Sequence, residues 1–368
     1  MIKILKRIIP TSIKEYLKSI IFKHITYSNL DHSKVADSGI KDKRDSINAS
    51  LRDKDISFVY ENVADSSILS DSFPPALKNE KRKEYYLERY PLKSRHIKFY
   101  NLISSSIDLA GKTVLEIGGS NTPIELAIKD IGAAKWICVD KPEKGDLDRY
   151  AEHYGEAGLY NFKDNPLSNV LASKDYAIYD EFADDMPKSF YGKFDVVISQ
   201  CSFEHIIELP TVLDLIYNVL KPGGIMLSWF GTIFSSFRGA HFGKTDEALN
   251  FSLSLQDLPR DLWHAHLLMG YAELYNFVAE KYGEPVAKKY IYSFKNCRIG
   301  GINRLFYEDY VFLMSRSPFE KKAVYPFLTD KLEPERMHIL QAMYPGYKRF
   351  DVRSLVIQGI KSSDGTLL

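Results

Sequence analysis

The sequence is poor in cysteine. Three cysteines, Cys138, Cys201 and Cys297, occur in 368 residues, and they lie far apart. Without a Cys-x-x-Cys pair, the sequence indicates neither a disulfide framework nor a zinc knuckle, and we predict no metal site. This cysteine usage is typical of a reducing compartment, so we expect a cytoplasmic protein.

Long hydrophobic runs and an excess of charge of one sign are also missing. No stretch approaches the roughly twenty apolar residues that a membrane-spanning helix needs. The net charge is +1 with 26% charged residues, so composition offers no basic surface for nucleic acid. With 45% apolar residues, the chain can bury one large core and a smaller subdomain.

The first 25 residues alternate basic and apolar side chains and contain a single acid, Glu15. Pro10 divides this segment, and Ser12-Ile-Lys-Glu15 is a capping box, so we expect two short amphipathic helices. They would either pack on the protein itself or lie on anionic lipid at the inner face of the membrane. A small-residue cleavage site is lacking, so a secretory signal is not indicated.

Residues 112–140 have the pattern of a strand, a tight turn, a helix and a second strand. Thr113 to Ile117 form an apolar run, Gly118 and Gly119 permit a turn, and Thr122-Pro123 suits a helix start. Asp140 follows Gly118 by about the twenty residues that place a carboxylate beside a bound ribose. The segment therefore predicts a site for a nucleoside cofactor.

A second ordered set of elements follows. Residues 194–200 form a strand-like run that leads into Gln200-Cys-Ser-Phe-Glu-His205, a helical stretch spans 209–220, and Lys221-Pro-Gly-Gly224 precedes a strand at 225–229. With Glu116-Ile-Gly118, this order resembles the class I S-adenosylmethionine-dependent methyltransferases, in particular those of bacterial polysaccharide assembly. The resemblance covers roughly residues 100–231, with a closing strand near 350–360.

The resemblance implies an α/β fold: a Rossmann-like, seven-stranded sheet with helices on both faces. It implies S-adenosylmethionine as cofactor, bound by Glu116, Gly118, Gly119, Ser120, Asn121, Asp140, Asp184, Gln200 and Cys201. The family's second and third loop glycines are replaced by Ser120 and Thr122. The Gly-x-Gly-x-x-Gly spacing of a nicotinamide dehydrogenase is lacking. Asp184 would contact the adenine, although a solvated acidic turn explains it equally.

His205 is the candidate general base, because it follows the carboxyl end of a strand, where open α/β sheets bind ligands. Deprotonation would activate a hydroxyl acceptor, and Glu204 would hold the imidazole. The alternative is a histidine that only packs against the cofactor or caps a helix.

The segment beyond residue 231 should determine the acceptor, and within it we expect helices at 271–282 and 333–344. We expect substrate contacts from His241, His264, His266, Asn303, Arg304 and Tyr307. Planar hydrogen-bonding groups and aromatic rings favour a sugar hydroxyl of a glycan or of a nucleotide-linked or lipid-linked saccharide. The open alternatives are backbone-bonded structural histidines, a packed helix over 305–310, N- or C-methylation of a small molecule, and a non-catalytic protein that binds the cofactor.

Five segments follow from these patterns. We predict a basic amphipathic segment at 1–30, a linker at 31–77, the cofactor-binding core at 78–231, a mostly helical substrate-recognition insertion at 232–345, and a closing strand with a tail at 346–368. The oligomeric state is not predicted.

Overall fold

The computed structural model describes residues 77–90, 92, 94–118, 122–141, 158–239, 260–293 and 301–363. Contacts divide the chain into the units Met1–Lys54 and Asp55–Leu368, and every described residue belongs to the second unit. The predicted amphipathic helices, Gly119, Ser120, Asn121 and His241 lie outside the described residues. Among the described residues, no helix has the length and apolar character needed to cross a membrane.

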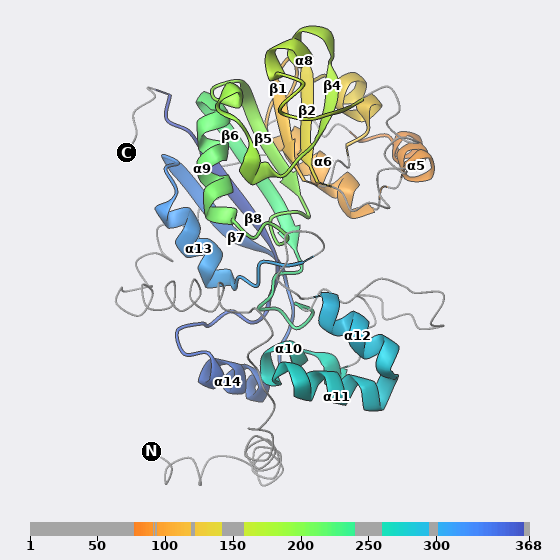
Figure 1. Ribbon diagram of the computed structural model, residues 1–368, viewed down its shortest axis with the longest axis vertical. Helices are drawn as coiled ribbons and strands as arrows, with labels where there is room; N and C mark the ends of the chain where they lie inside the picture. Colours follow the sequence, from red (N-terminus) through yellow and green to blue (C-terminus); the bar gives the residue numbers. More distant parts are fainter. Residues whose placement is uncertain are drawn as a thin grey trace. The chain divides into compact units, whose positions relative to one another are not determined.

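A mixed sheet of eight strands forms the centre, in the order β3-β4-β2-β1-β5-β6-β8-β7 (Figure 1). All neighbours from β3 to β6 are parallel, whereas β8 is antiparallel to both β6 and β7. The strands are β1 (Thr113–Ile117), β2 (Lys135–Asp140), β3 (Leu159–Tyr160), β4 (Tyr176–Asp180), β5 (Phe194–Gln200), β6 (Leu220–Gly231), β7 (Lys321–Thr329) and β8 (Val352–Ile360). The α/β prediction is confirmed, but its count of seven strands is wrong, because the two-residue β3 pairs with β4.

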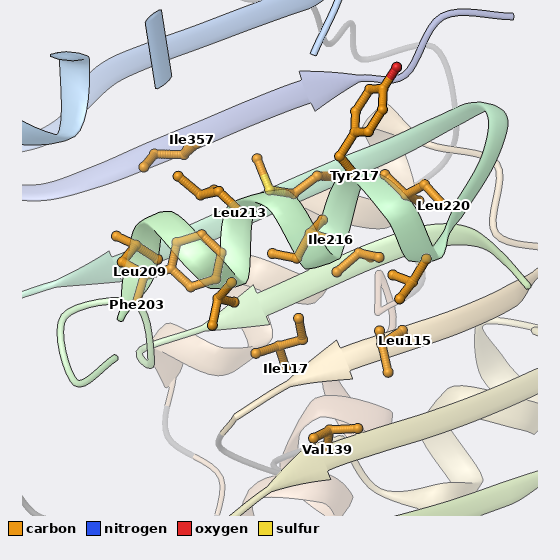
Figure 2. Close-up of a cluster of buried hydrophobic side chains, with 14 of the residues drawn as sticks. Leu115, Ile117, Val139, Phe203, Leu209, Leu213, Ile216, Tyr217, Leu220 and Ile357 are labelled. Carbon is orange, nitrogen blue, oxygen red and sulfur yellow. The ribbon is translucent and has the colours of Figure 1, made fainter. Parts of the chain in front are cut away.

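Successive side chains of a strand point to opposite sides of the sheet, and here the side chains on both sides are apolar. Helices therefore cover both faces. On one face, Leu115 and Ile117 pack with α8 (Leu167–Ser173), α9 (Leu209–Val219) and α13 (Tyr307–Arg316), a cluster shown in part in Figure 2. On the other face, Val114 packs with α5 (Glu80–Arg89), α6 (Ser94–Ser106) and the π-helical segment η2 (Glu125–Asp130). The parallel strands are therefore buried on both sides, as their nearly unbroken apolar runs require.

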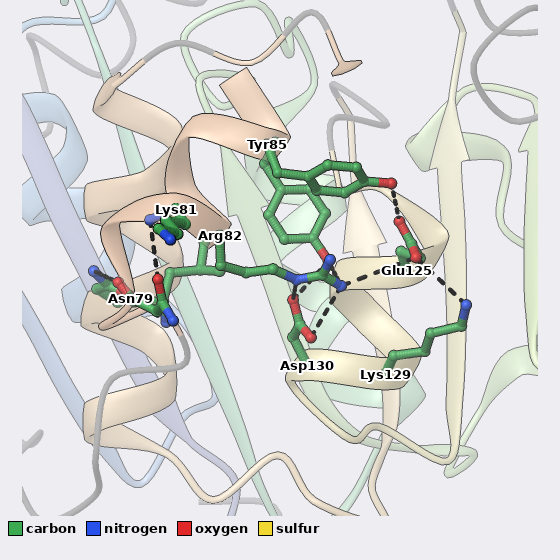
Figure 3. A network of polar contacts seen from close by, with 10 residues as sticks. Asn79, Lys81, Arg82, Tyr85, Glu125, Lys129 and Asp130 are labelled. Carbon is green, nitrogen blue, oxygen red and sulfur yellow. Dashed lines mark hydrogen bonds and ion pairs between the residues drawn. The ribbon is translucent and has the colours of Figure 1, made fainter. Parts of the chain in front are cut away.

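A polar network joins α5 to η2 (Figure 3). Arg82 Nε donates to Asp130 Oδ2 at 2.8 Å, Tyr86 Oη donates to the same oxygen at 2.6 Å, and Tyr85 Oη donates to Glu125 Oε2 at 2.6 Å. The bond to Asp130 raises the pKa of the Arg82 guanidinium further above its usual range. These contacts fix the helical segment that follows the glycine turn.

A third core lies between α10 (Ala265–Leu268), α11 (Tyr271–Tyr282), α12 (Glu284–Ser293) and α14 (Pro334–Met343). The helices predicted at 271–282 and 333–344 are confirmed as α11 and α14. The predicted insertion is not a single helical block, however. It also contains the sheet strand β7 and the helix α13, which packs on the main core.

Candidate active site

The turn after β1 lies directly beside the end of β2. Ile117 is in register with Val139, and the Gly118 N–H donates to the Val139 carbonyl oxygen at 2.8 Å. Asp140 is the next residue and the last of β2. The sequence prediction that brings this turn and this carboxylate to one edge of the sheet is confirmed.

Gly118 also touches the turn that follows β5. Its φ angle is +69°, and a Cβ added there would lie 2.5 Å from both Cβ and Oγ of Ser202. Only glycine combines that backbone conformation with so close an approach. The ends of β1 and β5 are therefore packed against each other at the expected cofactor site.

Buried polar groups support the turn from the face that α6 covers. Glu116 Oε2 accepts from Trp136 Nε1 at 2.8 Å and from the Cys138 thiol at 3.4 Å, and Tyr176 Oη donates to the Thr122 carbonyl at 2.7 Å. Burial, together with Glu116, holds the pKa of Cys138 well above its usual value, so the thiol keeps its proton. The recorded bonds of Glu116 tie β1 to β2, and contact with the cofactor stays a prediction.

Asp140 has an acidic neighbour at the end of the adjacent strand β4. Asp180 is in register with Asp140 at the end of β4, and Lys141 Nζ lies 3.1 Å from Asp180 Oδ1. The short helix Ala183–Asp185 follows and carries Asp184. Asp180 directly follows the apolar residues 176–179 of β4, and this place at the end of a strand is the signal in the sequence that could have identified it.

The chain reverses sharply after β5. Cys201 has a φ of +51°, which is uncommon outside glycine, and its N–H donates to the Trp229 carbonyl at 3.0 Å. The His205 N–H then donates to the Ser202 carbonyl at 2.8 Å. This turn keeps Gln200, Cys201 and His205 at the carboxyl edge of the sheet.

The imidazole of His205 is oriented by a distant backbone carbonyl. Its Nδ1 lies 2.7 Å from the Gly301 oxygen, and because a carbonyl only accepts, Nδ1 is the donor. In the neutral ring, Nε2 then carries the lone pair. Glu204 is buried, and its Oε1 accepts from the Gly231 N–H at 3.2 Å. The Gly301 oxygen thus orients Nδ1, and support of the imidazole by Glu204 stays a prediction.

Asn303 fastens the segment of Gly301 to the turn of His205. Its Nδ2 donates to the Phe203 carbonyl at 2.7 Å and to the Ile206 carbonyl at 3.2 Å, and its N–H donates to the Glu204 carbonyl at 2.8 Å. Its Oδ1 accepts from the Leu305 N–H and from Tyr310 Oη. These bonds occupy the buried amide, so the expected substrate contact by Asn303 is replaced by a structural role.

Three further predicted substrate residues are buried in cores. His264 Nε2 donates to the Phe350 carbonyl at 3.3 Å, His266 Nε2 donates to the Phe234 carbonyl at 2.8 Å, and Tyr307 belongs to the main core. The alternative reading of backbone-bonded histidines is therefore correct for both. Arg304 differs, since its guanidinium lies 5.3 Å from the ring centre of Tyr271, which is 41% exposed.

The two buried histidines predict an acid-sensitive fold. Burial lowers the pKa of His264 to about 3 and that of His266 to about 4. Between pH 6.5 and these values, both histidines are protonated in the unfolded chain but remain neutral in the folded chain. We expect the free energy of unfolding to fall by about 1.4 kcal/mol per pH unit for each histidine. Urea unfolding from pH 7 to pH 5 measures this slope, and a His264→Gln/His266→Gln variant with the same slope would refute the assignment.

One family model and several solved structures are similar to parts of this chain. Residues 171–228, which include β5 and His205, match a family described as "Methyltransferase domain". No curated protein matches the chain. A proposed S-adenosylmethionine-dependent methyltransferase of Listeria monocytogenes is 17% identical, covering 70% of this chain and 92% of its own, with a TM-score of 0.38. A methyltransferase of Mesorhizobium loti that depends on the same cofactor is 14% identical, covering 69% and 93%, with a TM-score of 0.35.

The match to the methyltransferase-domain family covers residues 171–228, from α8 to β6. The strand order and the turn beside Asp140 suit a methyltransferase that uses S-adenosylmethionine. Among the residues that the structure describes, no three His, Cys, Asp or Glu side chains form a group suited to a metal ion.

Proposed function

We propose that the protein methylates a hydroxyl group of a sugar, within a glycan or a nucleotide-linked or lipid-linked saccharide, and that His205 is the base. The observation that carries the proposal is the contact of His205 Nδ1 with the Gly301 oxygen. It assigns the basic lone pair to Nε2, on a turn at the edge of the sheet where cofactors bind. A hydroxyl needs such a base, whereas an amine needs less help.

The chain's own groups suit the donor. Bound S-adenosylmethionine would supply a methyl group on a sulfonium, ready for in-line displacement. Asp140 would accept the ribose hydroxyl protons, and the turn at Gly118 would let the ligand approach the backbone closely. His205 Nε2 would remove the acceptor's proton as its oxygen attacks the methyl carbon.

Arg304 and Tyr271 support a sugar as acceptor. Arg304 has a φ of +57° and follows Asn303, whose N–H bonds the Glu204 carbonyl beside His205. Its planar donors and the partly exposed ring of Tyr271 are groups that hold hydroxyls and the apolar faces of sugars. We therefore assign the acceptor contacts to Arg304 and Tyr271, because His264 and His266 are bonded to backbone carbonyls.

The test is transfer of labelled methyl groups into cell extracts, with products identified by mass spectrometry. We expect a labelled saccharide, and a loss of at least ~10²-fold in turnover for His205→Ala with the affinity for S-adenosylhomocysteine unchanged. Near-normal turnover of the variant would favour nitrogen or carbon methylation. A wild-type protein that binds the cofactor but transfers no labelled methyl group would be a non-catalytic binding protein, and the proposal would be refuted.

A further inference from the structure

Gln200 is a buried amide whose side chain has no hydrogen-bond partner among the residues that the structure describes. It is the last residue of β5 and is 1% exposed, and within that part of the chain neither Oε1 nor Nε2 meets a partner. A buried polar group without a partner destabilises a fold, so native proteins satisfy nearly all of them. Such a group at the edge of a binding site indicates a ligand that completes it.

The position of Gln200 on the sheet indicates which part of the ligand it meets. If Asp140 at the end of β2 holds the ribose, the amino-acid arm of the cofactor has to extend across β1 or away from it. On the far side of β1 lies β5, about 10 Å from β2 at two strand spacings. Gly118, which has no side chain to block the path, lies between them.

The chemistry of an amide matches the end of that arm. Nε2 offers two donors for a carboxylate, and Oε1 offers two lone pairs for an ammonium group. The side chain is uncharged, so it suits an α-amino-acid zwitterion better than a lone anion or cation. We propose that Gln200 binds the α-carboxylate and α-ammonium groups of the methionine arm, and is therefore a specificity residue for the intact cofactor. This inference rests on the proposed use of the carboxyl edge for S-adenosylmethionine.

The unsatisfied amide of Gln200 also affects the stability of the ligand-free protein. A substitution that removes an unsatisfied amide while keeping its shape should stabilise the ligand-free protein. Gln200→Met is such a change, because methionine is unbranched and close to glutamine in length. The matched control is Gln358→Met in β8, since Gln358 is equally buried but donates to Tyr325 Oη at 2.8 Å.

The experiment measures melting temperature and nucleoside affinity of the full-length chain. We expect Gln200→Met to raise the ligand-free melting temperature by about 2 to 4 °C, and Gln358→Met to lower it. Calorimetry would use S-adenosylhomocysteine and methylthioadenosine, which lacks the amino-acid end. Gln200→Met should weaken the first by at least ~10-fold and leave the second unchanged, whereas Gln358→Met should change neither.

Two results would overturn the inference and leave the proposed function intact: equal losses for both nucleosides, or wild-type affinity for both in Gln200→Met. A lowered melting temperature of Gln200→Met would also contradict it, because the amide would then have a structural partner. A wild-type protein that binds neither nucleoside would refute the proposed function itself, and the inference with it.

Discussion

Replacing Gly118 with alanine is expected to abolish cofactor binding and to destabilise the fold by ~3 kcal/mol or more. A φ of +69° costs an alanine about 1–2 kcal/mol, and the new Cβ would lie 2.5 Å from two atoms of Ser202. Relief of that contact has to move the turn after β1 or the turn after β5, and both form the expected cofactor site. Urea unfolding and titration with S-adenosylhomocysteine measure the two effects.

Gly111 provides the matched control for this prediction. It has the same φ of +69°, but apart from its two neighbours in the chain no described residue lies within 4 Å of a Cβ added there. Gly111→Ala should therefore show the backbone strain alone and bind the nucleoside normally. The double variant Gly118→Ala/Ser202→Gly should recover part of the lost stability. If Gly118→Ala behaved like Gly111→Ala, the close packing of the two turns would be refuted.

Asn303→Asp is expected to lower turnover by about 10²-fold while cofactor affinity stays within a factor of ~2. The substitution keeps Oδ1 for its two donors but replaces Nδ2, which bonds the Phe203 and Ile206 carbonyls. An oxygen facing those carbonyls frees the turn that carries His205. We also expect a loss of about 1–3 kcal/mol in the free energy of unfolding.

Stability and the pH profile of turnover together distinguish a purely structural role of Asn303 from a role in positioning His205. Asn101→Asp is the control, because Asn101 Nδ2 donates to the Leu77 carbonyl at 3.3 Å on the first turn of the described chain. It should lower stability without an effect on turnover. Asn303→Asp should in addition change the pH profile of turnover, since His205 would lose its fixed orientation. If Asn303→Asp kept wild-type turnover and an unchanged pH profile, the bonds of Asn303 to the Phe203 and Ile206 carbonyls would not position His205.

Structural features that depend on residues close together in the sequence could be predicted. The apolar run of β1, the glycine turn and Asp140 are linked through one strand–helix–strand unit, and parallel pairing brings them together. The helix α11 begins and ends at the predicted residues, because its apolar spacing and the flanking glycines are local signals.

Features that depend on distant pairing did not follow. Gly301 lies 96 residues from His205, and Asn303 lies 100 residues from Phe203, so no local pattern connects them. The Gly301 oxygen that orients Nδ1 of His205 could therefore not be predicted from the sequence. The substrate contacts predicted for His264 and His266 were wrong for a related reason, because their backbone partners are distant in the sequence. Their side chains suggested chemistry, but both are buried and bonded to backbone oxygens.

One methyl-donor nucleoside is expected to bind across the carboxyl ends of β2, β1 and β5. Hydrogen–deuterium exchange of the full-length protein, with and without S-adenosylhomocysteine, measures this binding segment by segment. Bound nucleoside should slow exchange at 113–118, 135–140 and 194–206 and leave α11 and α14 unchanged. Unaltered exchange in those three segments, or protection confined to other parts of the chain, would contradict this expectation.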